Sequence, residues 1–107
     1  MRPSQAGKAE IFAALGDETR IKLVSRLCVD GPQSITALAS GAKVTRQGIT
    51  KHLRVMEHAG LVRSHRDGRE VIWELEKRRL VVAQNYLNQI SRQWDDALAR
   101  LKILVEG

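Results

Sequence analysis

The segment "SITALASGAKVTRQGITKHLRVMEHAGLVRSHRDGREVIWEL", residues 34–75, decides the fold class of this chain. Its first half reads as two short helices joined by a turn that contains glycine, with the first helix at residues 36–40. Thr45 is a favourable N-cap for the second helix, and Gly60 is a favourable residue at its end. Two helices separated by so short a turn predict a helix-turn-helix over residues 36–59.

The second half of the same segment predicts a β-hairpin. The strand-like runs "LVRSHR" and "REVIWEL" flank Asp67-Gly68, a dipeptide that permits the positive backbone angles of a tight turn. We therefore expect residues 61–75 to form a hairpin directly after the helix pair. A hairpin at that place is the wing of a winged-helix domain, and this order of elements is more specific than either motif alone.

Two further helices are expected on the N-terminal side of the segment. The first covers residues 8–15, and the second runs from the capping residue Asp17 to about Val29. Residues 1–7 read as a flexible tail. The remaining residues, 8–107, are expected to form a single winged helix-turn-helix domain that is mainly α with a β-hairpin wing.

On the C-terminal side, residues 77–105 predict one long helix. Its apolar residues recur at alternating spacings of three and four over close to four heptads. One interpretation is a helix that lies on the core of its own domain. Three helices and a hairpin already supply that core, so we favour a dimerisation helix. The predicted dimer interface consists of Phe12, Leu15, Leu80, Leu87, Ile90, Trp94 and Leu101.

The positive charge of the chain is concentrated in one quarter of its length. The formal net charge is +6, and the window from Lys43 to Arg69 holds seven basic and two acidic residues, a net +5. Such a concentration favours an anionic partner. No stretch approaches the roughly 20 apolar residues of a membrane span, and no secretion signal is visible. We expect a cytoplasmic protein with no membrane partner.

The second helix of the pair has an apolar side and a polar side. Ile49, Leu53, Met56 and Ala59 fall on the side that can pack inward. The polar side suits the major groove of double-stranded DNA, because the groove accepts a helix and Gln, Arg and Thr can pair with base edges. Residues at the start of the second helix reach the bases in such motifs. The predicted base-reading set is therefore Thr45, Arg46, Gln47 and Thr50.

Cationic side chains farther along this helix and on the hairpin are expected to contact the DNA backbone. Contacts to phosphates position a protein on the duplex but carry no sequence information. The predicted phosphate-contacting set is Lys43, Lys51, Arg54, His65, Arg66 and Arg69.

Three residues allow more than one interpretation. Gly48 either lets the helix approach DNA closely, at a cost of about 1 kcal/mol in helix propensity, or is simply tolerated. His52 lies near the inward face, where a structural histidine is at least as plausible as a DNA contact. Cys28 is the single cysteine, so an internal disulfide is impossible, and a small buried residue is favoured over an intersubunit disulfide.

The leading functional interpretation is a sequence-specific DNA-binding regulator that acts as a homodimer on a palindromic site. The alternative is a winged-helix interaction module whose basic surface binds an acidic protein partner, against which the base-reading pattern argues. An enzyme is not expected, because the sequence has no set of nucleophile, base and orienting group and no Gly-rich phosphate loop. No cofactor is predicted, and the sequence names no small-molecule effector.

The sequence resembles the ArsR/SmtB family of bacterial winged-helix repressors. "ALGDETRIKLVSRL", residues 14–27, is similar to the opening helix junction of that family, and residues 38–75 are similar to its helix-turn-helix and wing. Within the second stretch, "KHLRVMEHAGLV" is the closest part. The resemblance implies a homodimeric transcriptional repressor, often of its own operon. It also implies that DNA release follows ligand binding or a chemical change at an allosteric site.

The metal ligands of the sensors in this family are missing here at two places. "SITALAS" has no cysteine pair, and the C-terminal helix has Asp95 and Asp96 but no histidine. Two carboxylates alone on a helix make a poor transition-metal site. "QWDDALARLK" near the C-terminus resembles the subgroup of the family that lacks metal ligands, so we predict no metal site.

Overall fold

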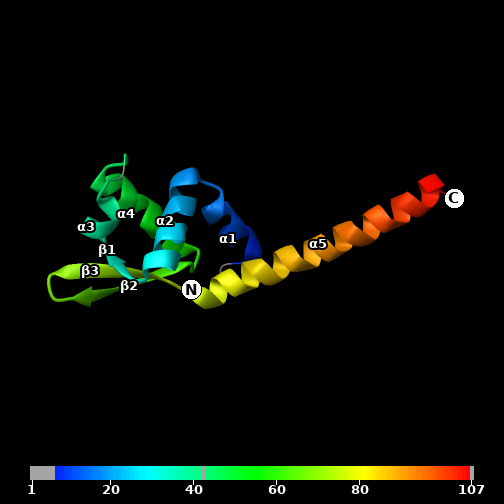
Figure 1. The fold of residues 1–107 in the computed structure, drawn as a ribbon. Coiled ribbons are helices and arrows are strands. Elements are labelled where there is room, and N and C mark those ends of the chain that lie inside the picture. Colours follow the sequence, from blue (N-terminus) through cyan, green and yellow to red (C-terminus); the bar gives the residue numbers. More distant parts are fainter. Residues whose placement is uncertain (1–6, 42, 107) are drawn as a thin grey trace.

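The structure is a computed structural model that describes residues 7–41 and 43–106 (Figure 1). Its elements in chain order are α1 (Lys8–Leu15), α2 (Glu18–Asp30), β1 (Gln33–Ser34), α3 (Ile35–Ala39), α4 (Arg46–His58), β2 (Val62–Asp67), β3 (Glu70–Leu75) and α5 (Lys77–Glu106). This order confirms the predicted fold class, a winged helix-turn-helix with a long C-terminal helix. The expected tail, residues 1–7, lies outside the described residues except for Gly7, which is the N-cap of α1.

Side-chain oxygens cap the N-termini of three helices. Asp17, Ser34 and Thr45 each accept a hydrogen bond from the backbone N–H three residues later, at 3.1, 3.1 and 3.0 Å. At Asp17 the bond from the Arg20 N–H stabilises the charged carboxylate and so lowers the pKa of this group below its usual value. The caps at Asp17 and Thr45 are where the sequence predicted them. The cap at Ser34 starts α3 one residue earlier than expected.

The core lies where α1, α2, α3 and α4 meet the sheet. Its largest fully buried side chains are Ile11, Leu38, Ile49, Leu53, Met56 and Leu61. The prediction of an inward face on α4 is confirmed, since Ala59 and the other three residues of that face are all buried. Arg26 ties α3 to α2, because its guanidinium donates to the carbonyls of Leu38 at 2.9 Å and Ala37 at 3.0 Å. Carbonyls at a helix C-terminus have no partner within the helix, so an outside donor stabilises them.

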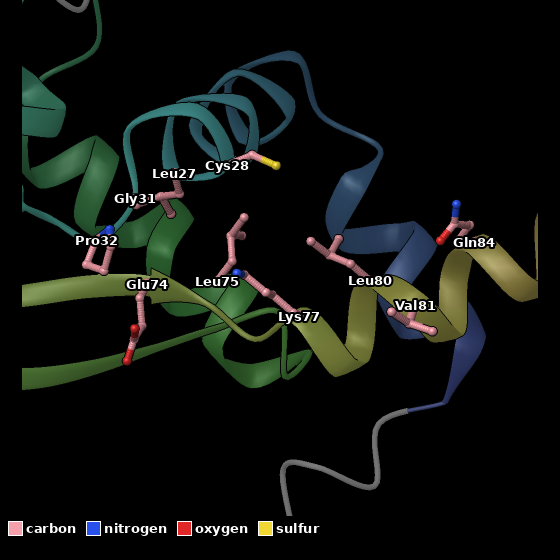
Figure 2. Close-up of a pocket in the computed structure, with 10 residues that line it drawn as sticks. All are labelled: Leu27, Cys28, Gly31, Pro32, Glu74, Leu75, Lys77, Leu80, Val81 and Gln84. Atoms are coloured by element: carbon pink, nitrogen blue, oxygen red, sulfur yellow. The ribbon is translucent and has the colours of Figure 1, made fainter.

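The buried side of α2 does not include Cys28. Leu23 and Leu27 are buried, whereas Ile21 and Cys28 are exposed. The prediction of a buried Cys28 is wrong, because the residue after Leu27 is turned by about 100° around the helix, away from the core. Cys28 instead lies at the edge of a cavity of about 340 Å³ between α2, β3 and α5 (Figure 2).

The sheet is antiparallel, with the strand order β1-β3-β2. β1 was not predicted, because a strand of two residues has no alternation to read. In the hairpin, Asp67 pairs with Glu70, so Gly68 and Arg69 are the central residues of the turn. The turn is thus one residue later than expected, with Gly68 at its first central position and a φ of +65°.

α5 packs on the rest of the domain only near its start. Ala83 is buried, and Tyr86 lies against Phe12 of α1 with the ring centroids 5.7 Å apart. Beyond Tyr86 the helix projects away from the domain, which gives the molecule dimensions of 67 × 33 × 20 Å (Figure 1). None of the described helices combines the length and apolar character needed to cross a membrane.

The predicted dimer-interface residues fall into two groups in this arrangement. Phe12, Leu15 and Leu80 are half-buried and pack against the core of their own chain. By contrast, the residues farther along α5 have no cover within the described chain. The exposed apolar residues of this distal part are Leu87, Ile90, Trp94, Leu98, Leu101, Ile103, Leu104 and Val105.

Candidate nucleic-acid interface

α4 presents a polar surface on the side opposite its buried residues. Arg46, Gln47 and Lys51 are exposed, and with the half-buried Thr50 they line a shallow hollow on the helix surface. Within residues 7–41 and 43–106, the side chains of Arg46, Gln47 and Lys51 make no hydrogen bond or ion pair. Their donors therefore remain available to an outside ligand. The structure brings the long side chains predicted for this helix together on one face.

The two threonines of the predicted base-reading set already have intramolecular bonds. The Thr45 hydroxyl oxygen accepts from the Gly48 N–H at 3.0 Å, which leaves the hydroxyl hydrogen free to donate. The Thr50 hydroxyl donates to the Arg46 carbonyl at 3.0 Å, which leaves its oxygen free to accept. The two residues therefore offer opposite hydrogen-bonding capacities, a difference that the sequence alone did not show.

Gly48 is explained by the packing of its own helix start. A Cβ atom at this position would lie 2.6 Å from Cγ1 of Val44 and 3.2 Å from Oγ1 of Thr45. Val44 is β-branched and stiff, so it cannot easily move aside. The glycine therefore has an intramolecular reason, which neither sequence interpretation included.

Arg54 differs from the other predicted phosphate contacts on α4. Its Nη1 lies 2.9 Å from Oε1 of Glu57, and its Cζ lies 5.3 Å from the centroid of the Trp73 ring. Arg54 thus links α4 to β3 while its side chain stays 62% exposed. Lys43 and Lys51 are exposed.

The wing carries two exposed arginines at its tip. Arg66 and Arg69 are exposed and, in the part of the chain that the structure describes, their side chains form no ion pair. Farther down the hairpin, Arg63 pairs with Glu74 at 2.9 Å and with Glu76 at 3.5 Å. His65 also faces Glu74, at 4.0 Å. The acidic side chains thus pair with Arg63 and face His65 at the base of the hairpin, whereas Arg66 and Arg69 near its tip, next to Asp67 and Glu70, have no ion-pair partner among the described residues.

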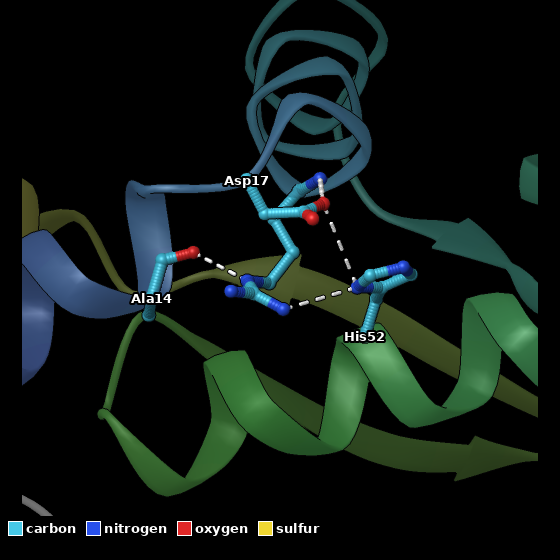
Figure 3. Close-up of polar contacts among 4 residues, drawn as sticks. Ala14, Asp17 and His52 are labelled. Atoms are coloured by element: carbon cyan, nitrogen blue, oxygen red, sulfur yellow. Dashed lines mark hydrogen bonds and ion pairs between the residues drawn. The ribbon is translucent and has the colours of Figure 1, made fainter.

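The position of His52 decides between its two interpretations. The side chain is 23% exposed, and its Nδ1 lies 3.2 Å from Nη1 of Arg20 and 3.8 Å from Oδ2 of Asp17 (Figure 3). His52 therefore points toward the start of α2 and does not belong to the exposed polar face of α4. Its position near the inward face was readable from the sequence, but Arg20 as its partner was not, since 32 residues separate them.

A metal centre has no support in the side chains around this surface. Among the described residues, no group of three or more His, Cys, Asp or Glu side chains is placed to hold a metal ion. The chemistry available at the surface is therefore hydrogen bonding and charge, which suits a polyanion with polar base edges.

Comparison with known proteins agrees with this geometry. A family model described as a helix-turn-helix domain matches residues 15–65. An ArsR-like transcriptional regulator from Rhodococcus sp. RHA1 has a similar structure, with a TM-score of 0.76, 37% identity and 91% of each chain covered. The HTH-type transcriptional regulator Rv2034 of Mycobacterium tuberculosis is 31% identical over 96 residues, which are 90% of this chain and 86% of the relative.

A further relative, the transcriptional repressor SmtB homolog of Synechocystis sp., is 31% identical over 90 residues, covering 84% of this chain and 62% of the relative. These relatives are transcription regulators rather than enzymes, which confirms the prediction that the chain is not an enzyme. The helix-turn-helix, the wing that follows it, and relatives that match nearly the whole chain lead to one assignment. The chain belongs to the ArsR/SmtB family of winged helix-turn-helix transcriptional regulators, which act by binding DNA.

Proposed function

We propose that two copies of this chain bind a palindromic DNA operator and repress transcription. In each half-site, α4 enters the major groove and the β2–β3 wing lies on the DNA backbone. The observation that carries the proposal is the polar face of α4, where the side chains of Arg46, Gln47 and Lys51 have no partner within the described chain. The tip of the wing lies at the same end of the molecule as α4 and away from the free end of α5 (Figure 1).

Base reading is assigned to the first turns of α4. Arg46 can pair with guanine and Gln47 with adenine, each in a two-bond geometry that the major groove presents. The free hydroxyl hydrogen of Thr45 and the free hydroxyl oxygen of Thr50 add one donor and one acceptor at the edges of this set. Arg46 and Gln47 therefore carry most of the sequence preference.

Phosphate contact is assigned to cations around this set. Lys43 and Lys51 flank the base-reading residues, and Arg66 and Arg69 offer exposed guanidinium groups near the tip of the wing. His65 and Arg54 contribute less, because each also faces a carboxylate of its own chain. These contacts give affinity for any sequence, and the release of counterions makes that affinity depend on salt.

The homodimer is supported by the distal part of α5. This part exposes Leu87, Ile90, Trp94 and Leu101 along one stripe. Trp94, the largest of these side chains, is 64% exposed. An apolar stripe that repeats every 3.5 residues buries itself by pairing with a second helix. A symmetric dimer presents two copies of α4, so it reads two half-sites about one helical turn of DNA apart.

Repression is supported by the relatives. The Synechocystis relative is described as a transcriptional repressor. A dimer bound over a promoter blocks access to it, and regulation of the chain's own operon follows from the family resemblance. Binding experiments with genomic DNA identify the regulated genes.

The test is a binding titration with two duplexes of equal length. One duplex carries the DNA upstream of the gene for this chain, and the other carries the same bases in shuffled order. We expect tighter binding to the upstream duplex, with a stoichiometry of two chains per duplex, at moderate salt. Equal affinity for both duplexes would overturn the proposal, and negligible affinity for both, with the dimer intact, would favour the acidic-protein partner instead.

A further inference from the structure

The start of α2 forms a polar contact with two other helices at one point. Nε of Arg20 donates to the carbonyl of Ala14 at the end of α1, at 2.6 Å. Nη1 of the same guanidinium lies 3.2 Å from Nδ1 of His52, in the middle of α4. Figure 3 shows Ala14, Asp17 and His52 converging on this point. One side chain thus bridges α1 and α4.

The proton positions in this contact follow from the donor chemistry. A guanidinium has donors and no acceptor, so Nδ1 of His52 accepts the bond from Arg20. A histidine that accepts at Nδ1 has its ring N–H on Nε2. Asp17 lies 3.8 Å from the same nitrogen, too far for a hydrogen bond, and accepts the backbone N–H of Arg20 instead. Arg20 and Asp17 are the charged groups that face the imidazole.

This contact constrains α4 in a way that its apolar packing does not. Ile49 and Leu53 bury one side of α4, which fixes the rotation of the helix to within the width of that apolar face. A hydrogen bond has a narrower directional preference, so the bond at His52 narrows the rotation of α4 about its own axis. His52 lies on the same helix as Arg46 and Lys51. Because these long side chains extend away from the helix axis, a small rotation of α4 displaces their ends more than it displaces the backbone.

The contact also connects α4 to the helix that packs on α5. α1 supplies the Ala14 carbonyl to Arg20, and its Phe12 packs against Tyr86 of α5. The order of contacts is therefore α5, α1, Arg20 and α4.

We propose that Arg20 and His52 form a clamp that positions α4 for sequence reading, so that both are positioning residues for operator binding. This inference rests on the proposed DNA-binding function. Neither side chain contacts DNA in this arrangement. Loss of the clamp lowers the affinity for the operator and leaves the affinity for unrelated DNA unchanged, because phosphate contacts tolerate a small rotation of α4 and base contacts do not.

The test compares three variants of the full chain on the upstream and shuffled duplexes. His52→Ala removes the acceptor. We expect operator affinity to fall about tenfold and shuffled-duplex affinity to stay unchanged, since a tenfold change is an ordinary size for the loss of one contact in a hydrogen-bond network. His52→Asn keeps an acceptor oxygen near the place of Nδ1, so it retains most of the operator affinity. His58→Ala is the matched control, since His58 is exposed on the same helix.

A second variant keeps the test decisive if His52→Ala does not fold. Arg20→Lys preserves the charge but cannot direct donors to Ala14 and His52 together, so it also loses operator affinity while the melting temperature stays close to that of the wild type. The double variant Arg20→Lys with His52→Ala loses no more operator affinity than the single variant with the larger loss, because both changes break the same contact.

The outcomes separate this inference from the function on which it rests. If the wild-type chain prefers the upstream duplex but His52→Ala and Arg20→Lys bind it as the wild type does, the clamp is wrong and the proposed function stands. Equal losses for His52→Ala and His52→Asn also overturn the clamp, because an acceptor then does not matter. If the wild-type chain shows no preference, the proposed function fails and the clamp fails with it.

Discussion

The guanidinium of Arg54 lies over the indole of Trp73, with its Cζ 5.3 Å from the ring centroid, and so joins α4 to the wing. Trp73 is buried in the sheet, and Arg54 also pairs with Glu57 on its own helix. A cation placed over an indole face is attracted by the ring quadrupole. A residue that the sequence assigned to phosphate contact thus also contacts the wing.

This relationship predicts that Arg54→Ala lowers the free energy of unfolding by roughly 0.5–1 kcal/mol, the usual size of a partly exposed cation–π contact. Urea denaturation measures the change. Lys51→Ala is the matched control, because it removes the same charge from an exposed position of α4 without a contact to the wing. If both variants are equally stable, Arg54 acts only through its charge.

The assigned roles on DNA predict two different kinds of binding defect. Arg46→Ala and Gln47→Ala should reduce the preference for the operator over shuffled DNA, by roughly 1–3 kcal/mol for each two-bond base contact that is lost. Arg66→Ala and Arg69→Ala should weaken binding to both duplexes and reduce the salt dependence of log K by about one phosphate contact. Titrations over a range of salt concentrations distinguish the two classes, and identical behaviour of the two pairs would refute the assignment.

The crowding around Gly48 predicts a suppressor pair. Gly48→Ala should lower the free energy of unfolding by about 1–3 kcal/mol through overpacking, even though alanine is the better helix former, because its Cβ would lie 2.6 Å from Cγ1 of Val44. The double variant with Val44→Ala should have a higher free energy of unfolding than the value obtained by adding the effects of the two single changes. Urea denaturation of all four proteins checks this, and strict additivity would mean that Val44 moves aside freely.

The cap at Asp17 predicts a contribution to stability at acid pH. Since the pKa of Asp17 is lowered in the folded chain, its contribution is fully present above the usual carboxyl pKa of about 4 and is lost as the pH falls through the folded pKa. Asp17→Asn keeps a capping oxygen that does not titrate, so its stability should fall less between about pH 5 and pH 3 than that of the wild type. Parallel slopes for the two proteins would show that the cap does not carry this dependence.

The exposed stripe on α5 predicts the assembly state. Leu101→Glu should convert the dimer to monomers in sedimentation experiments, because it places a charge in the apolar seam. Operator affinity should then fall by about 100-fold, since the second half-site no longer binds within the same complex. Ile103→Glu is the control, as this exposed residue lies across the helix from the stripe. A monomeric wild type, or equal effects of the two changes, would contradict the proposed interface.

The sequence by itself determined the order of the main elements and the inward face of α4. Thr45 and Asp17 are capping residues wherever a helix follows them, and the apolar spacing of Ile49, Leu53 and Met56 allows one buried side. Such signals are local, because the interacting groups lie within a few residues of each other. They predicted the helix-turn-helix and the wing, and they placed the long polar side chains of α4 on one face.

Tertiary structure alone decided the contacts between residues far apart in the chain. The pairing of β1 with β3, the exposure of Cys28, the position of Arg54 over Trp73 and the bond from Arg20 to His52 all depend on how the elements pack. Periodicity shows which residues share a face, but it does not show what that face meets. The polar side of α4 was therefore visible in the sequence, whereas the bond at His52 that orients it required the packed helices.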